Sequence, residues 1–222
     1  METHKNLTII GTSHISIESV KDVKEAFKKI NPSIIALELD KKRFFAIQNE
    51  GEKLSLKDIF SLGFRIFLLN LIGAWIEKKL GEKVGMKPGS EMIEAIKLAK
   101  EKKTKIALID QDVSITMRKL VKTPFKEKIK LLLEIIKGVI FKKGTLIKFD
   151  LRRVPPEELI EKMTKELRDK YPYIYRVLIK ERNVIMAKRI NHLMTNNKQE
   201  NILVVIGAGH KKEILEMIKN GG

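Results

Sequence analysis

Four short apolar runs divide the sequence into regular segments. They are Leu7–Gly11, Ile34–Leu39, Lys105–Ile109 and Ile202–Gly207, each rich in Ile, Val and Leu and each about the length of a strand. Their apolar character is continuous rather than alternating, which is typical of strands that are buried on both faces of a parallel sheet. The pattern therefore predicts four central strands.

The segments between these runs have a helical period. Ser16–Ile30 follows that period until Asn31-Pro32 stops it, and Gly89–Lys102 is amphipathic in the same way. Because strands alternate with helices, we predict an α/β fold with a mainly parallel central sheet flanked by helices.

Two longer stretches, about 55–85 and 113–195, predict an apolar helical insertion that forms a lid or a small subdomain beside the sheet. The expected elements are one or two helices in Ser55–Leu80, a pair in Val113–Phe141 broken at Thr123-Pro124, a helix opened by Pro155-Pro156, and a long helix from about Tyr173 to Met194. No internal repeat or low-complexity linker is visible, so we expect residues 1–222 to form a single domain.

Composition narrows the range of functions. The 222 residues include no Cys, which excludes a disulfide scaffold, a thiolate zinc site and a cysteine nucleophile. The net charge is +17, but Lys is spread along the chain rather than clustered, which favours a solvated surface over a nucleic-acid site. With no RNA-binding signature and only three Tyr, one Trp and nine Phe for base stacking, we expect no nucleic-acid partner.

The distribution of apolar residues also bears on location. The first residues lack the basic region and long apolar core of a signal peptide. Ile66–Ile76 and Leu131–Phe141 come closest to a membrane span, but both are too short and are interpreted as core or interfacial helices. We expect a protein of the cytoplasm or of the cytoplasmic face of a membrane.

Polar residues gather where the predicted strands end. Two runs lead into the Gly-x-x-His sequences Gly11-Thr-Ser-His14 and Gly207-Ala-Gly-His210, and the other two end at Glu38-Leu-Asp40 and Asp110-Gln-Asp112. Ligands of open α/β sheets bind at this edge, and glycine permits a sharp turn or a close approach of a ligand to the backbone. Imidazole and carboxylate together are ordinary ligands of a divalent transition metal.

Each of these residues also has a purely structural interpretation. His14 and His210 would cap helices or bind backbone, although their occurrence as a pair favours a ligand or catalytic role. Glu38 would be a buried partner of Arg43 or Arg182. Glu91 would cap a helix, Arg118 would lie on the surface instead of binding an anion, and Asp40, Asp110 and Asp112 would be caps or turn residues.

The order and rough spacing of these motifs resemble the TraB (TraB/PrgY) family across nearly the whole chain. The resemblance rests on Gly11-Thr-Ser-His14, Ala36-Leu-Glu38-Leu-Asp40 with Arg43, Gly89-Ser-Glu91, Leu108-Ile-Asp110 with Thr116 and Arg118, Glu181-Arg182-Asn183, and Gly207-Ala-Gly-His210. The family includes pheromone-shutdown proteins and is related to the metal-dependent TIKI proteases, which use Mn or Co, and more distantly to erythromycin esterases and ChaN-like proteins. Members often continue into C-terminal membrane helices, which this chain lacks, so the resemblance implies a trimmed domain or a short member.

The resemblance and the strand-end residues together predict a metal-dependent, peptidase-like hydrolase. Its divalent ion, Mn or Co with Zn as a further option, would be held by His14, His210, Glu38 and Glu91 and would activate a water molecule. Glu91 is alternatively the general base, and Arg118 or Arg182 would hold the substrate carboxylate or the oxyanion. The alternative is a non-catalytic domain that binds a peptide or pheromone, or a regulatory domain tethered to a membrane. The oligomeric state is left open, with a homo-oligomer allowed.

Overall fold

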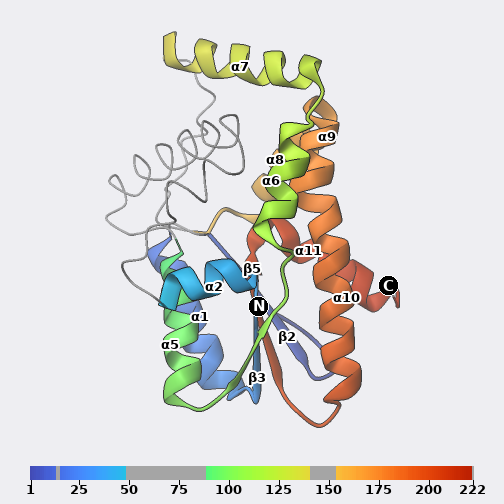
Figure 1. Ribbon diagram of the computed structural model, residues 1–222. Coiled ribbons are helices and arrows are strands. Elements are labelled where there is room, and N and C mark those ends of the chain that lie inside the picture. Colours follow the sequence, from blue (N-terminus) through green and yellow to red (C-terminus); the bar gives the residue numbers. More distant parts are fainter. Residues whose placement is uncertain (14–15, 49–88, 141–153, 222) are drawn as a thin grey trace.

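The sheet at the centre of the molecule has five strands. The computed structural model describes residues 1–13, 16–48, 89–140 and 154–221 (Figure 1). The strands are β1 (Glu2–His4), β2 (Leu7–Thr12), β3 (Ile34–Leu37), β4 (Lys105–Leu108) and β5 (Ile202–Gly207), in the order β1-β2-β5-β3-β4. The last four are parallel to one another, which confirms the predicted α/β fold and its four central strands.

The edge strand β1 was not predicted. It pairs antiparallel with β2, and Lys5 in the tight turn between them has a positive φ of 53°. Three residues of alternating exposure at the edge of a sheet carry no continuous apolar signal, so this strand forms only because β2 offers it an open edge.

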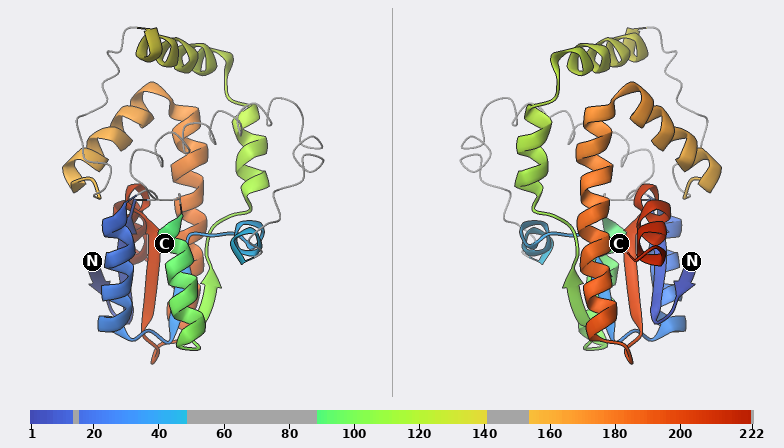
Figure 2. Two further views of the ribbon diagram at one scale, coloured as in Figure 1. Left: turned by 90° about the vertical axis from the view of Figure 1, so that its left-hand side faces the viewer. Right: turned by 90° about the vertical axis from the view of Figure 1, so that its right-hand side faces the viewer.

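Two pairs of helices cover the two faces of the sheet (Figure 2). On one face, α1 (Ile17–Ile30) and α5 (Ser90–Glu101) bury apolar side chains such as Val23, Phe27 and Met92 against it. On the other face, α10 (Glu181–Asn196) and α11 (Ala208–Lys219) bury Met186, Ile190 and Ile214. The central strands are therefore buried on both sides, as their continuous apolar runs predicted.

Local signals set the ends of these helices. The side chain of Ser16 accepts a hydrogen bond from the backbone N–H of Ser19 at 3.3 Å, which caps the N-terminus of α1. Asn31, which follows α1, takes the left-handed conformation with φ 44°, and Pro32 then prevents the helix from continuing.

A second group of helices extends beyond the carboxyl edge of the sheet (Figure 1). It consists of α6 (Val113–Val121), α7 (Phe125–Ile140), α8 (Glu157–Lys170) and α9 (Pro172–Tyr175). The break between α6 and α7 falls at Thr123-Pro124, as predicted. The predicted helices of Ser55–Leu80, with the apolar stretch Ile66–Ile76, lie outside the described residues.

The long helix expected from Tyr173 to Met194 differs from the prediction in two ways. A π-helical segment, Arg176–Lys180, joins α9 to α10 and widens the helix just before Arg182. The helical insertion was predicted to extend to about residue 195. However, α10 belongs to the layer that covers the sheet, because Met186, Ala187 and Ile190 lie in the hydrophobic core beneath that layer.

The short helix α2 (Lys41–Gln48) follows β3 at the carboxyl edge.

Candidate active site

The carboxyl ends of β3, β4 and β5 bring acidic side chains and a histidine together. Leu37 is in register with both Leu108 and Val205, so β3 and β4 end at the same level, and Glu38 and Asp110 follow one and two residues later. The backbone N–H of Gly207, which precedes the first turn of α11, donates to Oε2 of Glu38 at 2.5 Å. Glu38 is 3% exposed, so its charge is stabilised by donors and by the positive end of a helix rather than by water.

Arg182 of α10 fills the centre of this cluster. Its Nε and Nη2 bind the two oxygens of Asp110 at 3.0 and 2.7 Å, and Nη2 also binds Oε1 of Glu38. Its Nη1 donates to the carbonyl of Leu178 at 3.1 Å and lies 3.2 Å from Nε2 of His210. Five N–H groups thus face five acceptors. The planar guanidinium is the side chain that can satisfy all of them at once.

The charges in the cluster stabilise each other. Burial by itself would raise the pKa of Asp110, but the hydrogen bonds and charges of Arg182 and Arg43 outweigh it and lower the pKa of this carboxyl below its ordinary value. Burial would likewise lower the pKa of Arg182, and Asp110 and Glu38 raise it instead. Both groups are therefore charged throughout the physiological range, as a bidentate pair.

The ring of His210 lies beside this pair in the first turn of α11. Its Nδ1 is 2.6 Å from Oδ1 of Asn183, and its Nε2 is 3.4 Å from Oε1 of Glu38. Because the guanidinium of Arg182 only donates, Nε2 accepts from it and carries the lone pair, while Nδ1 carries the proton. The neutral imidazole therefore presents its basic nitrogen to the carboxyl edge.

The other residues singled out in the sequence have different surroundings. Glu91 lies in the first turn of α5 and is 1% exposed, whereas Arg118 is exposed on α6. His14 lies outside the described residues, so its proximity to His210 stays a prediction. Glu38 is the buried partner of Arg182, which confirms the structural interpretation offered for it.

The three aspartates that were expected to be caps or turn residues differ in their partners. Asp112 accepts from the backbone N–H of Ser114 at 2.7 Å, and Asp40 accepts from that of Lys42 at 2.8 Å, so both are caps as predicted. Asp110 was expected to be a third cap or turn residue. It accepts from the backbone of Gln111, but its main partners are Arg182 and Arg43, which makes it the buried acid of the cluster.

Sequence reasoning named Arg43 and Asn183 without predicting the partners that they have here, and it did not single out Glu213. Asn183 is fully buried and binds both His210 and Glu213, and Arg43 joins Asp40 to Asp110. A weak signal existed for two of them: Asn183 follows Arg182 directly, and Glu213 lies one helical turn after His210. Helical spacing alone did not reveal that they face the same site.

The described part of this site does not fit a divalent ion. Glu38 and His210 supply one oxygen and one nitrogen donor, yet the guanidinium of Arg182 contacts both of them and takes the position of a cation. Within the described ranges no group of three or more His, Asp or Glu side chains has an arrangement that could hold a metal. A metal site with His14 and Glu91 therefore stays a prediction.

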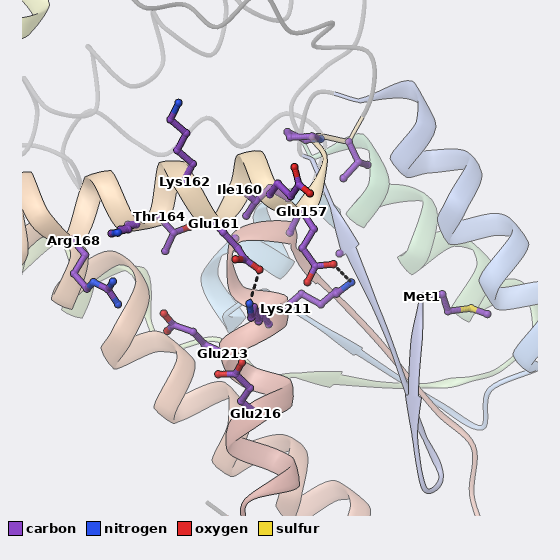
Figure 3. A pocket seen from close by; sticks show the side chains of 18 of the residues that line it. Met1, Glu157, Ile160, Glu161, Lys162, Thr164, Arg168, Lys211, Glu213 and Glu216 are labelled. Atoms are coloured by element: carbon purple, nitrogen blue, oxygen red, sulfur yellow. Dashed lines mark hydrogen bonds and ion pairs between the residues drawn. The ribbon is translucent and has the colours of Figure 1, made fainter.

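A cavity of about 810 Å³ lies on another side of the first turn of α11 (Figure 3). Its walls are charged side chains, mostly of α8 and α11, including the pairs Lys211–Glu157 and Lys212–Glu161. Glu213 also lines it, so this carboxylate connects the cavity with the buried cluster. No described residue of α7 lines this cavity.

One glycine of the Gly-x-x-His sequences is needed for packing. A Cβ on Gly11 would come within 3.1 Å of the Cα of Ala208 and 3.3 Å of the Lys211 side chain, so the start of α11 packs against β2 too closely for a side chain at residue 11 without a small shift. Gly209 has nothing within 4 Å of such an atom. Neither residue has a positive φ, so close approach rather than a left-handed turn explains Gly11.

The protein is therefore an α/β protein with a buried Glu-Arg-Asp-His cluster at the carboxyl edge of its sheet. Comparison with known families finds a match to the TraB/PrgY/gumN family over residues 2–222. The chain belongs to this family, as its motifs predicted.

Its relatives include proteins of archaea and of mammals. The chain is 37% identical over 219 residues to the uncharacterized protein MJ1365 of Methanocaldococcus jannaschii, covering 96% of this chain and 53% of that protein. It is 25% identical over 199 residues to the TraB domain-containing protein of Homo sapiens, covering 84% and 52%. The chain thus spans about half the length of the curated relatives it matches. The relation to the TIKI proteases stays a prediction.

The apolar helices bear on the expected association with membranes. Throughout the described part of the chain, no helix combines the length and the apolar character that crossing a bilayer requires.

Proposed function

We propose that this domain is a hydrolase of peptide-like substrates whose reaction centre is the cluster around His210. The observation that carries the proposal is the position of His210, whose Nε2 lies 3.4 Å from the buried carboxylate of Glu38 at the carboxyl edge of the sheet. That edge is where the ligands of open α/β sheets bind.

The chemistry assigned to His210 is general base catalysis. The attacking water would replace Nη1 of Arg182 as the donor to Nε2 and transfer a proton to it, and the resulting imidazolium would face Oε1 of Glu38. The carboxylate then stabilises the positive ring, and Asn183 holds the ring in place through Nδ1. Attack of this water on a carbonyl carbon would break the peptide bond, with the proton passing from the ring to the leaving amine.

The roles of the neighbouring charges follow from their partners. Arg182, with its five N–H groups engaged, holds Glu38, Asp110 and His210 in position rather than binding an oxyanion. Glu91 and His14, both predicted at this edge, complete the proposed site, and the exposed Arg118 is proposed to contact a substrate carboxylate.

The proposal is tested with purified protein and a library of quenched fluorescent peptides. We expect cleavage by the wild type and a loss on the order of 100-fold or more in His210→Ala, which removes the general base. His192→Ala, on the exposed face of α10, is the matched control and retains full activity. Equal cleavage by the wild type and His210→Ala would contradict the assignment.

The metal dependence predicted from the family is tested in the same assay. Chelator-stripped protein is measured alone and with Mn, Co or Zn, and metal content is determined for the wild type and for His14→Ala and His210→Ala. A metal requirement that both variants abolish would support a site completed by His14. Full activity of metal-free protein would support the imidazole alone.

A second candidate is a binding domain without turnover. The charged cavity between α8 and α11 favours it, because the cavity lies beside the cluster and its walls have both signs of charge, as a polar peptide would require. Saturable peptide binding without cleavage, weakened by Lys211→Glu but not by His210→Ala, would support this candidate and contradict the hydrolase. Exchange of the Lys charge tests the cavity alone.

A further inference from the structure

His210 is the end of a chain of hydrogen bonds that runs away from the carboxyl edge. Its Nδ1 lies 2.6 Å from Oδ1 of Asn183, and Nδ2 of Asn183 donates to Oε2 of Glu213 at 2.7 Å. The other oxygen of Glu213 accepts from the hydroxyl of Tyr175 at 2.5 Å. Four side chains from the three helices α9, α10 and α11 thus form one continuous path.

The direction of each hydrogen bond in this path is determined by chemistry. A carboxylate only accepts, so Glu213 obliges Asn183 to turn its NH₂ toward it and its carbonyl oxygen toward the ring. That oxygen in turn requires a proton on Nδ1 of His210. Burial, together with the hydrogen bond to Glu213, raises the pKa of Tyr175 to about 12, so the hydroxyl stays a donor at neutral pH.

The side-chain amide of Asn183 can form both of its hydrogen bonds in only one orientation. It is 0% exposed, and its amide lies between His210 and Glu213. An inverted amide would place Oδ1 against the carboxylate of Glu213, which is repulsive and leaves a buried donor and acceptor unpaired. The orientation of the amide is therefore set by the charge of Glu213.

We propose that Glu213 is a positioning residue for His210, which acts through Asn183 to hold the proton on Nδ1 and keep the lone pair on Nε2. This inference rests on the proposed function for its catalytic consequence. Arg182 also favours that tautomer, but its contact with Nε2 at 3.2 Å is lost once the ring takes a proton, whereas the contact with Asn183 persists. Glu213 thus holds the ring in both protonation states.

The chain offers a matched control for this residue. Glu216 is on the same helix and lines the same cavity as Glu213, and the two lie close together in Figure 3. Glu216 is exposed, and no hydrogen bond joins it to Asn183 or Tyr175. Changing either residue to Gln removes one negative charge from the cavity, but only Glu213→Gln affects the path to His210.

The tautomer is measured directly by long-range ¹H–¹⁵N NMR on ¹⁵N-histidine-labelled protein, with His210→Asn to assign the signal. We expect the Nδ1–H form in the wild type and in Glu216→Gln. In Glu213→Gln we expect a new population with the proton on Nε2, because the neutral amide lets Asn183 invert. A wild-type ring protonated on Nε2, or an unchanged signal in Glu213→Gln, would overturn the proposal.

A compensating pair distinguishes positioning from mere packing. Combining Glu213→Gln with Asn183→Asp restores an acceptor toward Nδ1, with the introduced amide donating to the introduced carboxylate, so the Nδ1–H signal should return. If Glu213→Gln fails to fold, Tyr175→Phe, which removes only the outer donor, is expected to give a smaller shift in the same direction. No return of the signal in a folded double variant would count against the proposal.

The kinetic arm separates this inference from the proposed function. If the protein hydrolyses peptides, kcat should fall in Glu213→Gln by about 10- to 100-fold with KM unchanged, as for other residues that orient a functional histidine. If no peptide is cleaved, the hydrolase proposal fails while the tautomer measurement still decides the role of Glu213.

Discussion

Two regions of this molecule hold the same kinds of charged side chain in different surroundings. In the cluster at the carboxyl edge, Arg182 binds Glu38 and Asp110, and the two carboxylates are 3% and 2% exposed. In the cavity wall, Lys212 binds Glu161, with side chains that are 51% and 48% exposed. The cluster is enclosed by protein, whereas the side chains of the cavity wall (Figure 3) are half exposed to solvent.

The comparison shows that burial rather than the number of ion pairs decides what a charge contributes. In the cavity wall, water replaces a lost partner at almost no cost. In the cluster, a charge that loses its partner remains in a medium that solvates it poorly. Mutation of the two regions should therefore give effects of different size, and four experiments follow from this difference.

The largest effect is expected for Arg182→Ala. It leaves the buried carboxylates of Glu38 and Asp110 without their common cation, and the free energy of unfolding should fall by about 3–5 kcal/mol. Urea unfolding followed by circular dichroism measures it. Arg168→Ala, an exposed arginine of α8, is the control and should change little. If Arg182→Ala were as stable as the wild type, the cluster would not stabilise the packing of α10 against the strand ends.

The next effect concerns Asp110 and pH. Because its pKa is lowered in the folded state, the stabilisation from its charge is complete above the ordinary Asp pKa of about 4 and is lost as the pH falls through the lower, folded-state value. In Asp110→Asn the stability at pH 7 should be lower by about 1.5–3 kcal/mol. Its decline in acid should also be shallower than that of the wild type. If the stabilities of the wild type and Asp110→Asn declined in parallel as the pH falls, the pKa of Asp110 would not be lowered in the folded state.

A smaller effect is expected where the two regions meet, at the start of α11. Gly11→Ala places a Cβ 3.1 Å from the Cα of Ala208, and the backbone shift should cost about 1–3 kcal/mol. Gly209→Ala meets nothing within 4 Å and lies in a helix, so we expect no loss or a gain of up to about 1 kcal/mol. Thermal unfolding of both variants tests the pair, and similar losses would contradict the packing argument.

The smallest effect is expected for the cavity wall. Lys212→Ala breaks the pair with Glu161, but both side chains are half exposed, so the unfolding midpoint should equal that of the wild type within error. The same should hold at high salt. A clear loss of stability would mean that the cavity wall, like the cluster, depends on its charges.

The sequence by itself determined the sheet and the residues at its carboxyl edge. Continuous apolar runs fixed the four parallel strands because only strands buried on both faces need them, and Ser16 and Asn31-Pro32 marked the ends of α1. The same reasoning placed Glu38 and the first turn of α11 at one edge, since parallel strands end together. The capping roles of Asp40 and Asp112 were also readable, because they depend only on neighbouring backbone.

Only the tertiary structure decided which of these side chains act together. Asp110 looked like another cap, Asn183 stood in a motif without a predicted partner, and Glu213 carried no motif, yet all three lie in the network around Arg182 and His210. Their partners are distant in the sequence, as with Arg182 and Glu38, which are 144 positions apart. Local sequence patterns indicate which secondary structure a segment favours and which of its faces is buried. The partner of a buried charge depends on how α10 and α11 pack against the strand ends, and that is a property of the assembled fold.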